Sequence, residues 1–264
     1  MEKRDWVWGY TMKKVPSTPS FYYGGTSHCS LETAVSYLGL KKAVYLNSAE
    51  TQDAICDEDF CYLKDCDEVV MALTHLEYAE SATKIGEFSK THPNVKGVII
   101  DDFLEEHGPS KDMTPEDLKE VYDNLKAQNP DLKLWVVRYS RHPIHQVDPY
   151  LPYIDGIIFW VWISTDHYWR YQYENDTWAL KQMGKEVVQG VFLHNYGEDY
   201  LKPMPMELLK LQMDMIGRAI ERREIDGFCF LQNGWMSRAD HREQVQFIKD
   251  YTDWFYGTHT DRRG

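Results

Sequence analysis

The sequence has no apolar run long enough to cross a membrane, and it is short of positive charge. Its longest apolar segments, such as Gly156–Ser164, have the length of a β-strand, whereas a membrane helix needs about 20 apolar residues. The chain carries 29 Lys and Arg against 42 Asp and Glu, a formal net charge of -13. Nucleic acids and anionic lipid surfaces bind basic faces, so neither a nucleic acid nor a membrane is expected as a partner.

Cysteine is also sparse. The five cysteines are an odd number and cannot all pair within the chain. Cys56, Cys61 and Cys66 follow one another at five-residue intervals without a CxxC pair or a nearby His, which is poor spacing for zinc. We expect reduced, partly buried thiols. The first residues contain no apolar signal segment, which fits a cytoplasmic protein or an exported one whose signal has been removed, and the oligomeric state stays open.

Several catalytic motifs are missing. The sequence contains no GxGxxG after a strand, no P-loop, no HExxH and no GxSxG, which disfavours a Rossmann, P-loop or α/β-hydrolase protein. The hydrophobic fraction of 43% and the charged fraction of 27% are those of an ordinary globular protein. Aromatic residues are abundant at 14%, with 9 Trp and 18 Tyr, and they can fill a core, form an interface or stack on sugar rings.

Short β-rich apolar runs alternate with amphipathic segments of helical period along the chain, a pattern typical of βα units around a parallel sheet. One helix start is explicit, because Thr114-Pro115-Glu116-Asp117 combines an N-cap residue, a first-turn proline and an acidic first turn. A chain of 264 residues has the length of one such barrel, so we expect residues 1–264 to form a single (β/α)8 TIM barrel domain. The expected strands are Trp6–Met12, Ala43–Asn47, Glu68–Leu73, Lys96–Asp101, Lys133–Arg138, Gly156–Ile163, Glu186–His194 and Gly227–Gln232.

The most distinctive segment is Gly97-Val-Ile-Ile-Asp101-Asp102-Phe-Leu-Glu105-Glu106. Active sites of (β/α)8 barrels lie at the carboxyl ends of the strands, and here an apolar strand delivers two adjacent carboxylates to such an end. Because side chains alternate along a regular strand, we expect one of Asp101 and Asp102 to face the barrel mouth; counting from Gly97 favours Asp101. Desolvation and mutual repulsion split carboxyl pKa values, so that one group can donate a proton while another stays ionised. The alternative is a structural role, in which these acids cap the loop or bind a cation.

Polar and aromatic residues at the other strand ends are candidates for the rest of the site. Arg138 could pair with the two aspartates, clamp a substrate carboxylate or form a structural ion pair. Trp160 and Trp162 alternate on one strand and could form a platform for a sugar ring or fill the core. His194 and His75 could be acid/base groups, metal ligands or hydrogen-bonded structural residues. The expected substrate-binding residues are Trp8, Tyr10, Asn47, Arg138, Tyr139, Trp160, Trp162, His194, Gln232 and Trp235.

These strand ends resemble those of glycoside-hydrolase-like (β/α)8 barrels, over nearly all of the chain. The segments that carry the resemblance are Gly97–Phe103, Asp155–Trp162 and Gly190–Tyr196. In many such families the acidic end of strand four supplies a nucleophile or the general acid. Two departures stand out. Strand seven ends in His194-Asn195 where some families place a carboxylate, and the DxxDxDxE pattern of chitinase-like families is matched at most by Asp101 and Glu105.

The resemblance implies a hydrolase that cleaves glycosidic bonds of a carbohydrate substrate, with no cofactor expected. Asp101 or Asp102 would act as nucleophile or charge stabiliser. The expected proton donor is one of Glu105, Asp166 and Glu198, of which Asp166 would suit families with a strand-four nucleophile and a strand-six acid.

Two other functions are compatible with the same residues. The first is a metal-dependent barrel enzyme, in which Asp101, Asp102, His194 or His75 hold a divalent ion. The second is a noncatalytic carbohydrate-binding barrel that uses the tryptophans Trp160, Trp162 and Trp235.

Overall fold

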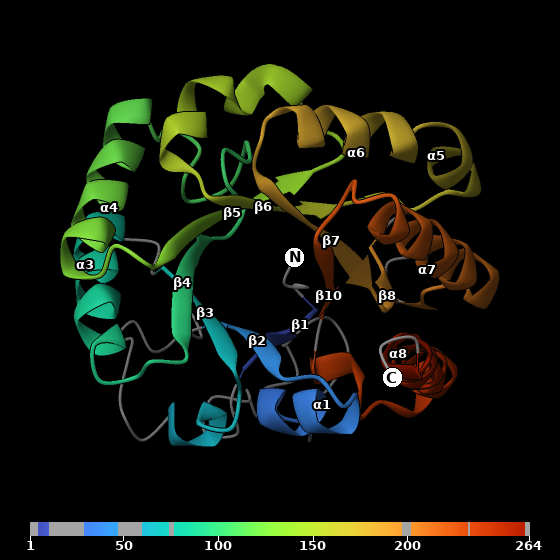
Figure 1. The fold of residues 1–264 in the computed structure, drawn as a ribbon. Helices are drawn as coiled ribbons and strands as arrows, with labels where there is room; N and C mark the ends of the chain where they lie inside the picture. The colour runs from blue at the N-terminus through green and yellow to red at the C-terminus, as the bar shows by residue number, and fades with distance from the viewer. Residues whose placement is uncertain are drawn as a thin grey trace.

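The computed structural model of the protein describes residues 5–10, 29–46, 60–73, 77–196, 202–231 and 233–261, with side chains to residue 257. In this part of the chain, parallel strands close into a barrel in the order β1-β10-β7-β6-β5-β4-β3-β2, and helices surround it (Figure 1). The expected (β/α)8 fold is therefore confirmed. The barrel strands are β1 (Trp6–Gly9), β2 (Lys42–Tyr45), β3 (Glu68–Ala72), β4 (Val95–Ile100), β5 (Lys133–Tyr139), β6 (Gly156–Trp160), β7 (Glu186–Phe192) and β10 (Gly227–Leu231).

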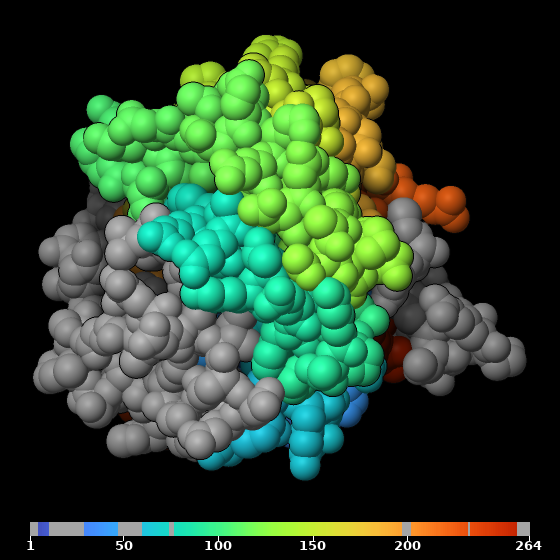
Figure 2. All heavy atoms as spheres, turned by 90° about the vertical axis from the view of Figure 1, so that its left-hand side faces the viewer, coloured from blue at the N-terminus to red at the C-terminus, as the bar shows by residue number. Residues whose placement is uncertain are grey.

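Helices and short segments connect these strands. The α-helices are α1 (Leu31–Tyr37), α3 (Tyr78–Ser89), α4 (Pro115–Gln128), α5 (Asp166–Tyr171), α6 (Tyr173–Gln182), α7 (Met206–Glu221) and α8 (Arg242–Asp261). Four 3-10 segments, Cys61–Leu63, Ile144–Tyr153, Asn233–Trp235 and Ala239–His241, and an antiparallel pair, β8 (His194–Asn195) with β9 (Lys202–Pro203), complete the described elements. Figure 2 shows α3 and α4 side by side on one face of the molecule. No helix in the described ranges is long and apolar enough to span a membrane.

The predicted start of α4 is confirmed in atomic detail. The Thr114 hydroxyl accepts a hydrogen bond from the backbone N–H of Asp117, and the Asp117 carboxylate accepts one from the backbone N–H of Thr114. This reciprocal capping box satisfies donors at the helix start that have no partner inside the helix.

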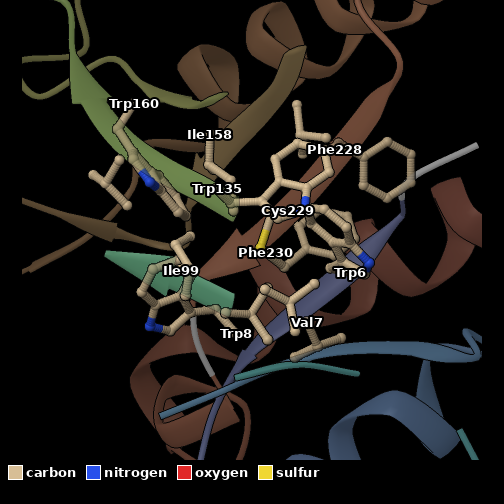
Figure 3. Close-up of a cluster of buried hydrophobic side chains, with 14 of the residues drawn as sticks. Trp6, Val7, Trp8, Ile99, Trp135, Ile158, Trp160, Phe228, Cys229 and Phe230 are labelled. Atoms are coloured by element: carbon tan, nitrogen blue, oxygen red, sulfur yellow. The ribbon is translucent and has the colours of Figure 1, made fainter. Parts of the chain in front are cut away.

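Tryptophans and other apolar side chains fill the barrel interior (Figure 3). The rings of Trp6 and Trp135 meet edge to face with centroids 4.8 Å apart. A Cβ atom at Gly156 would lie 2.2 Å from the Trp135 ring, and one at Gly190 would lie 2.0 Å from the Trp160 ring. The glycines thus create the space that the indoles occupy, and the interior is a packed core whose upper layer forms the floor of the barrel mouth.

Seven of the eight barrel strands end one to three residues earlier than their apolar runs predict, and two of these early ends lie beside the site. Strand β4 ends at Ile100 instead of Asp101, and β6 pairs with its neighbours only as far as Trp160 instead of Ile163. Both differences fall at the carboxyl ends of strands, where the chain turns from the sheet into the loops that carry the site.

Candidate active site

A cavity of about 170 Å³ opens at the carboxyl ends of the barrel strands. Two carboxylates, Asp101 and Asp102, lie among aromatic rings that come from four strands or the loops after them. The cavity is lined by Trp8, Asp101, Asp102, Tyr139, Trp160, Trp162, Phe192, Tyr196 and Leu231. Six of the expected site residues therefore meet in one place.

Both aspartates line the cavity, although a regular strand would bring only one of them there. Strand β4 stops at Ile100, and Asp102 has a φ of 47°, in the left-handed region that non-glycine residues seldom adopt. This turn breaks the alternation and lets Asp102 follow Asp101 into the mouth. The Asp102 N–H donates a hydrogen bond of 2.9 Å to Oδ1 of Asp101, so the two groups are coupled through the backbone as well.

The loop after β4 holds this unusual conformation in place. Ser110 is buried; its hydroxyl donates to the Asp102 carbonyl at 3.0 Å and accepts from the Leu104 N–H at 3.0 Å. Leu104 also has a left-handed φ of 58°. A Cβ atom at Gly108 would lie 2.9 Å from the Asp102 carbonyl oxygen. Strained backbone of this kind persists only where its surroundings determine it, and here Ser110 provides the bonds that do so.

Asp101 has the properties of a proton donor. Burial, together with the neighbouring charge of Asp102, raises the pKa of Asp101 to about 7, and the hydrogen bond from the Asp102 N–H opposes this rise only in part. A carboxyl group with such a pKa is largely protonated in weakly acidic solution.

Asp102 is held as a hydrogen-bond acceptor. The Tyr139 hydroxyl, at the end of β5, donates to Oδ1 of Asp102 at 2.5 Å. Burial, the charges of both aspartates and this hydrogen bond raise the pKa of Tyr139 well above its ordinary value, so the phenol keeps its proton. The two adjacent carboxyl groups therefore have different hydrogen-bond partners and different surroundings.

Aromatic rings form the walls of the cavity. Trp160 packs edge to face against Trp8, with centroids 5.9 Å apart, and lies 4.8 Å from Phe192. Trp162 lies beyond the end of β6 and stacks on Tyr196 at 5.8 Å. Trp160 is buried, whereas Trp162 is partly exposed. Trp160 thus belongs to both the core and the pocket floor, and Trp162 stands at the rim.

Glu105 is tied into an ionic cluster beside the cavity instead of lining it. Its Oε2 lies 2.8 Å from Nη2 of Arg141 and 2.7 Å from Nε2 of His142. Partial burial would raise the pKa of Glu105, but hydrogen bonds from Arg141 and His142 outweigh it and lower that pKa. Burial lowers the pKa of His142. A carboxylate kept ionised in this way is a poor proton donor.

Two other expected site residues lie elsewhere. Arg138 is a candidate for pairing with the aspartates, for binding a substrate carboxylate or for a structural ion pair; its guanidinium is buried and donates to Oε1 of Gln146 and to the Pro143 carbonyl, which holds the loop after β5. Asp166 lies in the first turn of α5, exposed and paired with Arg170 at 2.8 Å. Neither residue lines the cavity.

His194 and Trp235 form a separate buried stack. Their rings are parallel within 10° at 4.2 Å, and Nδ1 of His194 lies 3.0 Å from Nε2 of His241. Tyr10 is positioned through its backbone, which bonds to the side chain of Asn233 and links β1 to the segment after β10. Trp235 also donates to the Tyr196 hydroxyl at 3.2 Å, so this stack supports the cavity wall from behind.

Four other candidates, Asn47, His75, Glu198 and Gln232, lie outside the described residues. Among the residues that are described, no three His, Cys, Asp or Glu side chains are grouped as a metal site.

Sequence reasoning missed two aromatic residues, Phe192 at the end of β7 and Tyr196 beyond it, and the ion pair between Arg141 and Glu105. Phe192 could have been found, because it continues the alternation of Val188 and Gly190 on β7. No such signal exists for Tyr196 or Arg141, because both follow the last residue of their strand and no periodicity governs their direction.

Comparison with known proteins identifies the class of fold. No protein-family model matches the chain, and a search of curated proteins finds no match. Solved structures with similar barrels include a glycoside hydrolase family 5 mannosidase from Rhizomucor miehei, with a TM-score of 0.62, 12% identity and coverage of 88% of each chain. A β-D-glucuronidase from Dictyoglomus thermophilum has a TM-score of 0.53 and 14% identity over 84% of this chain, which spans 46% of the glucuronidase chain.

The similarity extends beyond glycosidases. A chain of the tryptophan synthase complex from Pyrococcus furiosus matches with a TM-score of 0.54 and 10% identity, over 97% of this chain and 100% of that one. At these identities the likeness establishes a (β/α)8 barrel like those of glycoside hydrolases and other enzymes. The activity has to be argued from the site itself.

Proposed function

We propose that the protein hydrolyses glycosidic bonds, with Asp101 as the proton donor and Asp102 as the carboxylate that faces the positive charge developing on the sugar. One observation carries the proposal: two adjacent carboxyl groups share one cavity but have different surroundings. Asp101 has a pKa raised to about 7, while Asp102 accepts a hydrogen bond from Tyr139. Glycosidic cleavage uses one carboxylic acid to protonate the leaving oxygen and one carboxylate to stabilise or attack the anomeric carbon.

The shape of the cavity supports a sugar as substrate. Indole and phenol rings present apolar faces on which the C–H groups of a sugar ring can pack, and they exclude water from the reacting bond. The apolar surroundings also raise the pKa of Asp101, because they disfavour its charged form. The same walls therefore bind the substrate and prepare the acid.

A panel of α- and β-linked aryl glycosides tests the proposal with the wild type, Asp101→Asn and Asp102→Asn. Loss of a general acid typically costs about 100- to 10,000-fold in rate, and we expect losses in this range in both variants. Asp166→Asn should keep the wild-type rate, because Asp166 is exposed and paired with Arg170 outside the cavity. In the wild type, the rate should fall as the pH rises through about 7, where Asp101 loses its proton.

A noncatalytic carbohydrate-binding barrel is the second candidate, and the aromatic lining of the cavity favours it. Sugar binding that persists in Asp101→Asn and Asp102→Asn, together with no turnover by the wild type on any glycoside, would establish this alternative. Turnover that survives both substitutions would contradict the roles proposed for the two aspartates.

A further inference from the structure

Arg141 is a cationic group at the rim of the cavity. Its guanidinium carbon lies 4.3 Å from the centroid of the Trp162 ring and 4.9 Å from that of Tyr139, and both rings line the cavity. The side chain is 38% exposed, so it is accessible to a molecule that enters the mouth.

The guanidinium is oriented before any ligand binds. Oε2 of Glu105 forms an ion pair with Nη2 of Arg141 at 2.8 Å, and the same carboxylate oxygen lies 2.7 Å from Nε2 of His142. Stacking on two rings and an anchored ion pair together restrict the rotamers of a side chain that would otherwise move freely. A ligand that binds Arg141 therefore loses less conformational entropy than one that binds a mobile surface arginine.

The anchor leaves donors unused. An arginine carries five N–H groups, and Glu105 is the one ion-pair partner that Arg141 has among the described residues. Arg138, at the end of strand β5, is buried and bonded to Gln146 and Pro143, so it cannot serve a ligand in the same way. Arg141 is thus a fixed cation with unused donors beside a cavity of about 170 Å³.

We propose that Arg141 is a specificity-determining residue that binds an anionic substituent of the sugar, such as the carboxylate of a uronic acid or a sulfate or phosphate ester. This inference rests on the proposed function, in which the cavity binds a sugar, and it adds that the preferred sugar is an acidic one.

Ligand binding measured by calorimetry at pH 7 tests this assignment without requiring turnover. The ligands are D-glucuronate and D-galacturonate against D-glucose and D-galactose, with glucose 6-sulfate and glucose 6-phosphate to distinguish the kind of anion. Hydrogen bonds between charged groups are strong, so we expect at least one acidic sugar to bind about tenfold or more tightly than its neutral parent. Arg141→Gln should abolish this preference, and Arg141→Lys should keep part of it.

Arg170→Gln is the matched control, because it removes an exposed arginine from an ion pair outside the cavity; the preference should survive there. Glu105→Gln is a second test that keeps Arg141, and it should weaken the preference by loosening the guanidinium. Equal binding of acidic and neutral sugars, no measurable binding of any acidic sugar, or a preference that persists in Arg141→Gln would each overturn the proposal. If the protein prefers acidic sugars but never cleaves a glycoside, the role of Arg141 in anion binding is supported and the proposed hydrolase activity is refuted. If it cleaves neutral glycosides and shows no preference for acidic sugars, the hydrolase activity is supported and the role of Arg141 is refuted.

Discussion

Replacing Asp101 by asparagine should stabilise the folded protein in a way that grows with pH. Asparagine has nearly the same shape, and its Oδ1 can still accept the hydrogen bond from the Asp102 N–H. What the substitution removes is the ability to ionise in a buried position beside another carboxylate. The folded state raises the pKa of Asp101 from 3.8 to about 7. It therefore favours the protonated form, and the wild type loses stability as the pH rises from about 4 through 7.

The size of the effect follows from the two pKa values. They differ by 7 minus 3.8, or about 3, and each pKa step corresponds to about 1.4 kcal/mol. An ionised Asp101 thus costs the folded state up to about 4 kcal/mol at pH 8, and almost none of this cost is present at pH 4. The asparagine side chain is neutral throughout, so the variant should gain on the wild type by up to that amount between these two pH values.

Urea unfolding, followed by tryptophan fluorescence at several pH values from 4 to 8, measures this difference. Asp166→Asn serves as the control, because it replaces an exposed carboxylate that lies outside the cavity. A stability difference between Asp101→Asn and the wild type that does not change with pH would refute the reasoning. It would mean that Asp101 is not shifted by burial and by Asp102, and the assignment of the proton donor would fall with it.

Three further substitutions test the supports of the site. Tyr139→Phe removes the hydrogen bond to Asp102 and should lower kcat by about tenfold or more with little change in folding, since bonds to charged groups contribute about 1.5–3 kcal/mol; an unchanged kcat would separate Tyr139 from the chemistry. Ser110→Ala leaves a buried N–H without its acceptor and should cost about 1–3 kcal/mol in unfolding free energy, and a wild-type Tm would contradict the role given to the loop. Gly190→Ala places a Cβ atom 2.0 Å from the Trp160 ring; overpacking of this kind costs about 1–3 kcal/mol, whereas an unaffected Tm would show that the indole can move aside.

The barrel could be predicted because its signals are local and repeated. Each strand is a short apolar run, and one start, that of α4, is encoded in four consecutive residues from Thr114 to Asp117. The ends of the strands were harder to place, because an apolar residue after a strand looks the same as one within it. Val161 is buried as deeply as Trp160, yet the pairing with β5 and β7 stops at Trp160.

Local sequence patterns also predicted the site residues that lie on or directly after the strands, but not those whose direction is set by loops and helix starts. Trp160 is the last residue of β6, and Asp101 comes directly after β4 and continues its alternation, so the strand pattern predicts that both side chains face the barrel mouth. Asp166 could not be placed, because Thr165 caps a helix there and turns the carboxylate toward solvent. Glu105 illustrates a second difficulty: its position near the site was predicted, but its role depends on partners from the loop after β5 that the sequence does not reveal.

The departure from regular structure is what makes the site. A regular β4 would send Asp102 to the helix layer and leave a single carboxylate in the mouth, where no neighbouring charge would raise the pKa of Asp101. The left-handed turn at Asp102 costs backbone energy, of the order of 1–3 kcal/mol. Ser110 offsets that cost with two hydrogen bonds to the loop, and the result is a pair of adjacent carboxyl groups with different partners in one cavity. Local rules are broken most often at functional sites, so the break at Asp102 is itself an argument for function.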